Sequence, residues 1–159
     1  MPLDGSNRQP ETGGDTLKTI FLMMVGVMAW AGSLQAQELD SEQMAALQVM
    51  SSYMDESTHT QGMVTPQQVQ ASYLGVAQIL DTREEAQYEE GHLPGAVPME
   101  WRQVLERRQE IATDKPVLLY CGTGALSAQA GFALRALGYS NVVIMRGGYH
   151  DWQKLMAGQ

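Results

Sequence analysis

The stretch that decides the fold is VLLYCGTGALSAQAG, residues 117–131. Its first four residues form a continuous apolar run, which is typical of a strand covered on both faces. A glycine-rich turn follows, and residues 127–138 then have the pattern of a helix that stops at Gly138. Cys121, the only cysteine of the chain, stands where the strand ends and the turn begins.

The alternation of strand and helix continues outward from this stretch. Apolar runs predict further strands at 75–81 and 141–145, and a loop at 91–99 leads into another short extended piece. Helical patterns occupy 64–73, 83–90, 101–111 and 147–156, and the first of these helices has Thr65 as its expected N-cap and Pro66 at its first position. This order predicts an α/β fold, in which a central parallel sheet is flanked by helices on both faces.

The position of Cys121 indicates a working thiol. In parallel α/β folds, ligands bind beyond the carboxyl ends of the strands. A helix that starts within 125–127 would direct free N–H groups and its dipole toward the sulfur, and both favour the thiolate. Gly122 and Gly124 allow the backbone to curl and turn its amides inward. The alternative is a buried cysteine that only packs, and the strand-end position favours the functional interpretation.

Spacing excludes three other loop chemistries. A dinucleotide-binding loop needs a third glycine three residues after Gly124, where the chain has Ser127, and a P-loop needs a Gly-Lys-Ser/Thr sequence that is absent. A cysteine phosphatase needs an arginine six residues after the cysteine, which is again the position of Ser127. A single cysteine also rules out a C-x-x-C redox motif and a cysteine-rich zinc site.

Three motifs in order resemble a single rhodanese (sulfurtransferase) domain over about residues 64–155. ILDTREEAQYEEGHLPGAV at 79–97 is similar to the first family motif, and VLLYCGTGALSA at 117–128 is similar to the active-site strand and its six-residue loop. MRGGYHDW at 145–152 is similar to the closing Gly-Gly-x-x-x-Trp motif. The resemblance implies that the Cys121 thiolate takes a sulfur from a small donor such as thiosulfate and passes it, as a persulfide, to a thiophilic acceptor, without a cofactor or metal.

The resemblance also implies roles for the residues around the cysteine. It assigns the active-site loop that binds the substrate to Gly122, Thr123, Gly124, Ala125, Leu126 and Ser127. It assigns supporting roles to Asp81 and Arg83 as an ion pair, to His92 as a loop-ordering residue, and to Gly147 and Gly148 as a turn close to the loop. His150 is expected at the surface and Trp152 in the core.

The loop departs from the family in its charge. Many family members carry an arginine or lysine at its end, where this chain has Ala125 and Leu126. An anionic donor would lack a charged side chain in the loop, although backbone amides alone can cradle an anion. This departure keeps a second hypothesis open: a catalytically weak rhodanese-like module that binds a partner protein or senses oxidants through Cys121.

The amino terminus has the layout of an export signal. Lys18 precedes an uncharged run at 19–37, which ends in small residues typical of a cleavage zone. We expect residues 1–36 to be a signal peptide of a periplasmic or otherwise exported protein, or an uncleaved membrane anchor as the lesser alternative. The net charge of −8 argues against nucleic acid and anionic membrane surfaces as partners.

Residues 37–62 are predicted to form a short helix and a linker ahead of a rhodanese domain at 63–159. Met44, Leu47, Met50 and Met54 recur at helical spacing on this helix. Methionine sulfur suits soft metals such as copper, but a methionine stripe at this spacing usually packs against a neighbour. We therefore expect packing rather than a metal site, with 41–54 as a candidate interaction surface for a protein partner.

Overall fold

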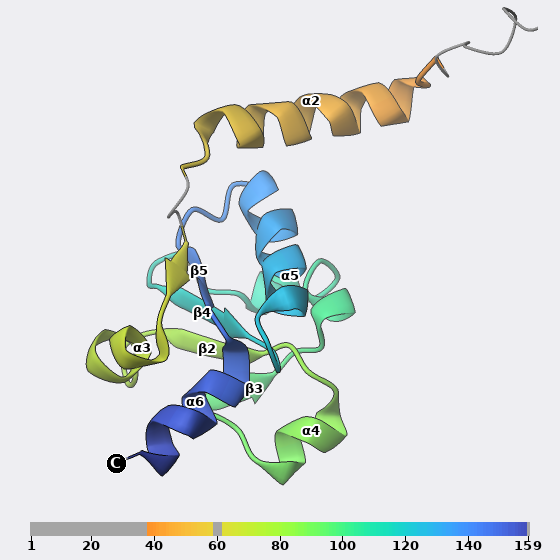
Figure 1. Cartoon of the computed structure of the whole chain (residues 1–159). Helices are drawn as coiled ribbons and strands as arrows, with labels where there is room; N and C mark the ends of the chain where they lie inside the picture. The colour runs from red at the N-terminus through yellow and green to blue at the C-terminus, as the bar shows by residue number, and fades with distance from the viewer. Residues whose placement is uncertain (1–37, 59–61, 159) are drawn as a thin grey trace, which may run out of the picture. The chain divides into compact units, whose positions relative to one another are not determined.

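The computed structural model describes residues 38–58 and 62–158. Within them lies a five-stranded sheet in which every pairing is parallel. The strands are β1 (Met63–Val64), β2 (Gln78–Asp81), β3 (Ala96–Pro98), β4 (Val117–Tyr120) and β5 (Val142–Met145). Their order across the sheet is β1-β5-β4-β2-β3 (Figure 1). The predicted α/β fold is confirmed.

Helices cover both faces of this sheet. The α-helices are α2 (Ser41–Glu56), α3 (Pro66–Ser72), α4 (Glu85–Glu90), α5 (Ala125–Ala136) and α6 (Gly148–Ala157), and the 3₁₀ helices are η1 (Trp101–Gln103) and η2 (Arg108–Glu110). On one face Leu118 and Tyr120 pack with Val69 of α3 and Trp152 of α6. On the other face the alternate strand residues pack against α5. The capping box that starts α3 uses Thr65 and Gln68, so the predicted N-cap is confirmed.

Strand β4 is the centre of the fold. All four of its side chains are 0% exposed, as the uninterrupted apolar run predicts. Burying each large apolar side chain stabilises the fold by about 1.5–3 kcal/mol. Because β2 and β5 flank β4 and Asp81 pairs with Tyr120 in register, the ends of three strands meet where Cys121 begins its loop.

The prediction of a helix at 101–111 is wrong. The structure has η1 and η2, two short 3₁₀ turns, in its place. The side chain of Gln78 explains the break, because it donates to the carbonyl of Glu110 at 2.8 Å and accepts from the N–H of Ala112 at 2.7 Å. These bonds pull the chain toward β2, and Ile111 is extended there instead of helical.

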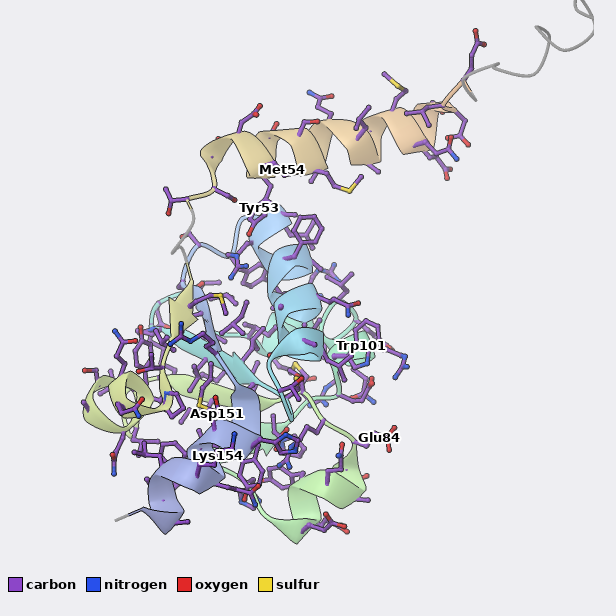
Figure 2. The ribbon with its side chains drawn as sticks, in the orientation of Figure 1. Tyr53, Met54, Glu84, Trp101, Asp151 and Lys154 are labelled. Carbon is purple, nitrogen blue, oxygen red and sulfur yellow. The ribbon has the colours of Figure 1, made fainter. Side chains whose placement is uncertain are left out.

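The methionine stripe on α2 does not pack as predicted. Met44, Met50 and Met54 are exposed, and α2 contains no buried residue. The neighbouring residue Tyr53 makes the contacts instead, and it is labelled beside Met54 in Figure 2. Its ring meets that of Phe132 edge-on at 5.0 Å between centroids, and its hydroxyl accepts from Nε of Arg135 at 3.1 Å. Adjacent helical residues point about 100° apart, so the side chains of Tyr53 and Met54 point in different directions.

The predicted signal, residues 1–36, lies outside the described residues. Among the described helices none is long and apolar enough to span a membrane. The described residues from 42 onward belong to one compact unit. Within residues 38–58 and 62–158 no group of three or more histidine, cysteine, aspartate or glutamate side chains could hold a metal ion.

Candidate active site

The sulfur of Cys121 lies inside a turn of backbone. The side chain is 2% exposed, and its Sγ accepts a hydrogen bond from the N–H of Gly124 at 3.2 Å. The hydroxyl of Ser127, a fully buried residue, lies 3.7 Å from the same sulfur. That hydroxyl also donates to the carbonyl of Gly124 at 3.0 Å. The loop therefore folds around the sulfur with its donors facing inward.

A left-handed residue closes this turn. Gly124 has φ of +98° and is the N-cap of α5, which begins at Ala125 as the sequence predicts. A Cβ atom on Gly124 would lie 3.3 Å from the carbonyl oxygen of Met145, so the close approach of β5 also favours glycine. The result is that the amino-terminal end of α5 points at Cys121.

These donors stabilise the thiolate. Burial raises the pKa of the Cys121 thiol, but hydrogen bonds from the backbone of Ser127, Thr123 and Gly124 and from the Ser127 hydroxyl lower it by more. The pKa of Cys121 therefore lies below its ordinary value. A lowered thiol pKa increases the fraction of nucleophilic thiolate, in the direction that the strand-end position predicts.

The turn after β5 holds the outside of the loop. The N–H of Tyr149 donates to the carbonyl of Cys121 at 2.7 Å, and that of His150 donates to the carbonyl of Gly122 at 3.0 Å. Gly148 has φ of +57°, and a Cβ there would collide with the carbonyl oxygen of Cys121 and lie 2.7 Å from that of Gly122. The predicted role of Gly147 and Gly148 as a turn against the active loop agrees with these contacts.

A buried ion pair lies at the end of β2. Nη2 of Arg83 is 2.5 Å from Oδ2 of Asp81, and both side chains are buried. The same Nη2 donates to the carbonyl of Gly91 at 2.7 Å, so the pair ties the 91–96 loop to the strand. Thr82, which sequence reasoning missed, donates through its N–H and its hydroxyl to the carbonyl of Tyr120 at 2.8 and 3.0 Å. The only sign of this role in the sequence was the position of Thr82 directly after the buried strand β2.

Tyr120 connects this network to the loop at 121–127, because it directly precedes Cys121. Its hydroxyl accepts from the N–H of Leu93 at 3.1 Å. Burial, together with the neighbouring carboxylate of Asp81, raises the pKa of Tyr120, so it stays protonated. His92 is exposed; its Nδ1 lies 3.0 Å from the carbonyl of Tyr88, and its ring stacks on the ring of that residue at 3.9 Å. The structure thus places His92 in the loop it was predicted to order.

A family comparison decides what this arrangement is. Residues 65–155, more than half of the chain, match the family model described as a rhodanese-like domain. The chain belongs to the rhodanese family. It is 37% identical to the uncharacterized protein YqhL of Bacillus subtilis, over 56% of this chain and 70% of that protein. It is 29% identical to the thiosulfate sulfurtransferase GlpE of Pseudomonas syringae, over 57% and 85% of the two chains.

A solved structure shows the same fold. The crystal structure of a rhodanese-related protein from Thermoplasma volcanium matches with a TM-score of 0.55 at 22% identity, over 58% of this chain and 91% of that one. At this identity the likeness concerns the fold alone.

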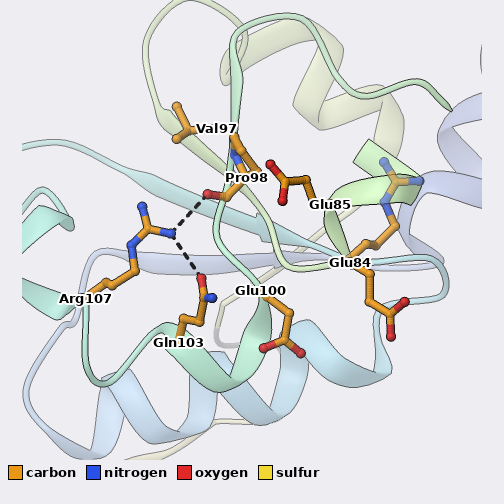
Figure 3. Close-up of a pocket in the computed structure, with 8 residues that line it drawn as sticks. Glu84, Glu85, Val97, Pro98, Glu100, Gln103 and Arg107 are labelled. Atoms are coloured by element: carbon orange, nitrogen blue, oxygen red, sulfur yellow. Dashed lines mark hydrogen bonds between the residues drawn. The ribbon is translucent and has the colours of Figure 1, made fainter. Parts of the chain in front are cut away.

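The rhodanese loop of this chain has an uncharged outer face. Thr123 and Ala125 are exposed and Leu126 is half-buried. A pocket of about 520 Å³ lies nearby in the fold, at the ends of β2 and β3, but no residue of 121–127 lines it (Figure 3). Its walls include Glu84, Glu85 and Glu100. Arg83 and Arg107 line it as well, so its walls carry both signs of charge, and Cys121 is not among the residues that line it.

The sequence analysis placed His150 at the surface but gave it no role beside the loop. His150 is exposed, as expected, yet a Cβ atom on Gly122 would lie 3.9 Å from both Cε1 and Nε2 of its ring. The imidazole therefore covers Gly122 at van der Waals distance. The signal that could have found it is its place two residues after the Gly-Gly turn, given that this turn closes on the loop.

Proposed function

We propose that this chain is a sulfurtransferase in which Cys121 carries the transferred sulfur. The observation that carries the proposal is the inward-facing ring of donors around a cysteine whose pKa is lowered. Relatives that share the domain and are named thiosulfate sulfurtransferase support it. The donor would be a small sulfur compound, and the acceptor would be a thiophile.

The first half-reaction is a displacement at sulfur. With thiosulfate as donor, the Cys121 thiolate attacks the outer, sulfane sulfur; a new S–S bond forms and the S–S bond of thiosulfate breaks. Its electron pair leaves with sulfite, and Cys121 becomes a persulfide anion. No proton, oxidant or cofactor is consumed, so one cysteine is sufficient.

The second half-reaction reverses the roles. A thiophilic acceptor such as cyanide attacks the outer sulfur of the persulfide, thiocyanate forms, and the Cys121 thiolate is the leaving group. A group with a low pKa leaves more easily, so the donors that activate Cys121 in the first step also assist the second. The N–H groups at the start of α5 face the space that the outer, negatively charged sulfur would enter.

Mass measurement of the intact full-length chain tests the proposal. After incubation with thiosulfate, and separately with polysulfide, we expect a mass gain of one sulfur atom that cyanide removes. Cys121→Ser should show no gain, and Ser72→Ala, which changes an exposed serine at the end of α3, should behave like the wild type. No adduct with either donor would overturn the proposal and would favour the alternative, a module that binds a protein partner or senses oxidants.

We also propose that the protein is exported, on the evidence of residues 1–36 alone. Cell fractionation with sequencing of the amino terminus tests this proposal. A shortened chain outside the cytoplasm is expected, a full-length chain in the membrane fraction would indicate the anchor, and a full-length soluble chain in the cytoplasm would refute export.

A further inference from the structure

We propose that His150 binds anions beside the 121–127 loop. In its protonated form it supplies the positive charge that the loop lacks. This inference rests on the proposed function, and it names the donor class as small sulfur anions whose binding strengthens as the pH falls. It makes His150 a specificity-determining residue rather than a nucleophile or base.

The geometry places the imidazole against the loop. The backbone N–H of His150 is held by the carbonyl of Gly122 at 3.0 Å, and its ring lies 3.9 Å from where a Cβ of Gly122 would be. Gly122 directly follows Cys121, and adjacent Cα atoms are about 3.8 Å apart. Along these bonds and contacts the ring is therefore within about 12 Å of the sulfur, a distance comparable with the Debye length of about 8–10 Å at ordinary ionic strength.

The other cationic groups near the site are already paired or face elsewhere. Arg83 is bound to Asp81 and to the carbonyl of Gly91, and its guanidinium lies over the ring of Tyr149 at 4.2 Å. Nζ of Lys154 is 2.8 Å from Oδ1 of Asp151, and Figure 2 labels both residues. Arg146 lines a separate pocket formed with α3 and the later part of α6.

Two elements lie beside the His150 imidazole: its own helix and the loop after β4. Its own helix contributes Asp151, whose pKa is lowered mainly by the hydrogen bond from Lys154 and also by Arg146 and His150. Asp151 therefore keeps its negative charge through neutral and mildly acidic pH. The loop packed against the imidazole contributes only the Cys121 thiolate, and residues 122–127 carry no charge. Histidine is the side chain that changes charge between about pH 5 and pH 8.

A ratio of alkylation rates isolates this charge from the reactivity of the thiol. Iodoacetate is an anion and iodoacetamide is neutral, and both react with the thiolate of Cys121, so the titration of the cysteine cancels in the ratio of their rates. The chain has one cysteine, and the modified Cys121 peptide can be quantified by mass spectrometry on the full-length protein.

We expect the ratio of iodoacetate to iodoacetamide rates to rise by about three- to fivefold between about pH 8 and pH 5.5. In His150→Gln the ratio should be independent of pH, and in His150→Lys it should be high throughout. Ser72→Ala, an exposed change at the end of α3, is the control, and it should keep the pH dependence. A wild-type ratio that does not change, or one that changes equally in His150→Gln, would overturn the inference.

The kinetics with thiosulfate then separate this inference from the proposed function. If Cys121 takes up sulfur, KM for thiosulfate should be raised several-fold in His150→Gln at about pH 6, with little change in kcat. An unchanged KM would refute the role in donor binding while leaving the sulfurtransferase intact. Absence of any persulfide in the wild type, with the alkylation ratio as expected, would refute the proposed function alone.

Discussion

Removal of the Ser127 hydroxyl should raise the pKa of Cys121. The hydroxyl is fully buried, lies 3.7 Å from the sulfur, and is one of the groups that lower the thiol pKa. In Ser127→Ala the thiolate loses this donor, while the backbone N–H groups of Thr123, Gly124 and residue 127 remain. The pKa should therefore rise without returning to the value of a free cysteine.

The size of the shift follows from the geometry. A hydrogen bond to a charged group contributes about 1.5–3 kcal/mol, and this one is long and shared with the carbonyl of Gly124, so we take about 1 kcal/mol. At about 1.36 kcal/mol per pKa unit, the pKa should rise by about 0.7 unit. At a pH below both values, this rise lowers the thiolate fraction, and with it the alkylation rate, about fivefold.

The assay is the rate of iodoacetamide modification as a function of pH, measured on the wild type, Ser127→Ala and the control Ser72→Ala. A urea titration of each protein confirms that the variants are folded. If Ser127→Ala is folded and its midpoint pH equals that of the wild type, the reasoning is wrong, because the backbone amides alone would then hold the thiolate.

Three further predictions concern the frame around the loop and its stability. Gly148→Ala should lower the free energy of unfolding by about 1–3 kcal/mol and slow persulfide formation, because its methyl group would collide with loop carbonyls; Gly75→Ala, with similar φ and open space around it, should leave the loop reactive. Arg83→Gln should cost about 3–5 kcal/mol in a urea titration by leaving Asp81 buried without its partner, and a double variant with Asp81→Asn should cost less than the sum of the two single changes. Because the pKa of Cys121 is lowered by folding, the thiolate stabilises the fold fully above the unfolded value of about 8.5, and this contribution is lost as the pH falls through the folded pKa. The stability of the wild type relative to Cys121→Ser, from urea titrations between about pH 6 and pH 9.5, should therefore increase with pH, and a decrease would contradict the lowered pKa.

The sequence was sufficient to predict the strands and helices whose backbone is determined by their own residues. The apolar run at 117–120, the Thr65–Pro66 start of α3 and the glycine at the start of α5 each determine their own backbone. Residues 101–111 misled because their helical spacing is real, yet a side chain from another strand, Gln78, takes the backbone groups at 110 and 112. A partner 32 residues away leaves no mark in local periodicity.

The same distinction separates the parts of the site. Cys121 and its glycines could be predicted because the nucleophile, the turn and the helix start are consecutive. The contact between His150 and Gly122 could not, because it depends on how closely the turn after β5 approaches the loop after β4. The absence of a cation at Ala125 and Leu126 is visible in the sequence, but the histidine that we propose to supply the charge lies in the turn after a different strand.

The convergence of three strand ends holds this loop in place, although the loop has no charged residue of its own. Its carbonyls at 121 and 122 are held by the start of α6, and the carbonyl of Tyr120 is held by Thr82 at the end of β2. With the backbone fixed from both sides, the loop amides and the Ser127 hydroxyl stabilise the sulfur without a charged side chain in the loop. The positive charge that attracts an anionic donor can then come from a neighbouring element. If that charge is on a histidine, the preference for anionic donors depends on pH, whereas an arginine in the loop would keep its charge at every pH.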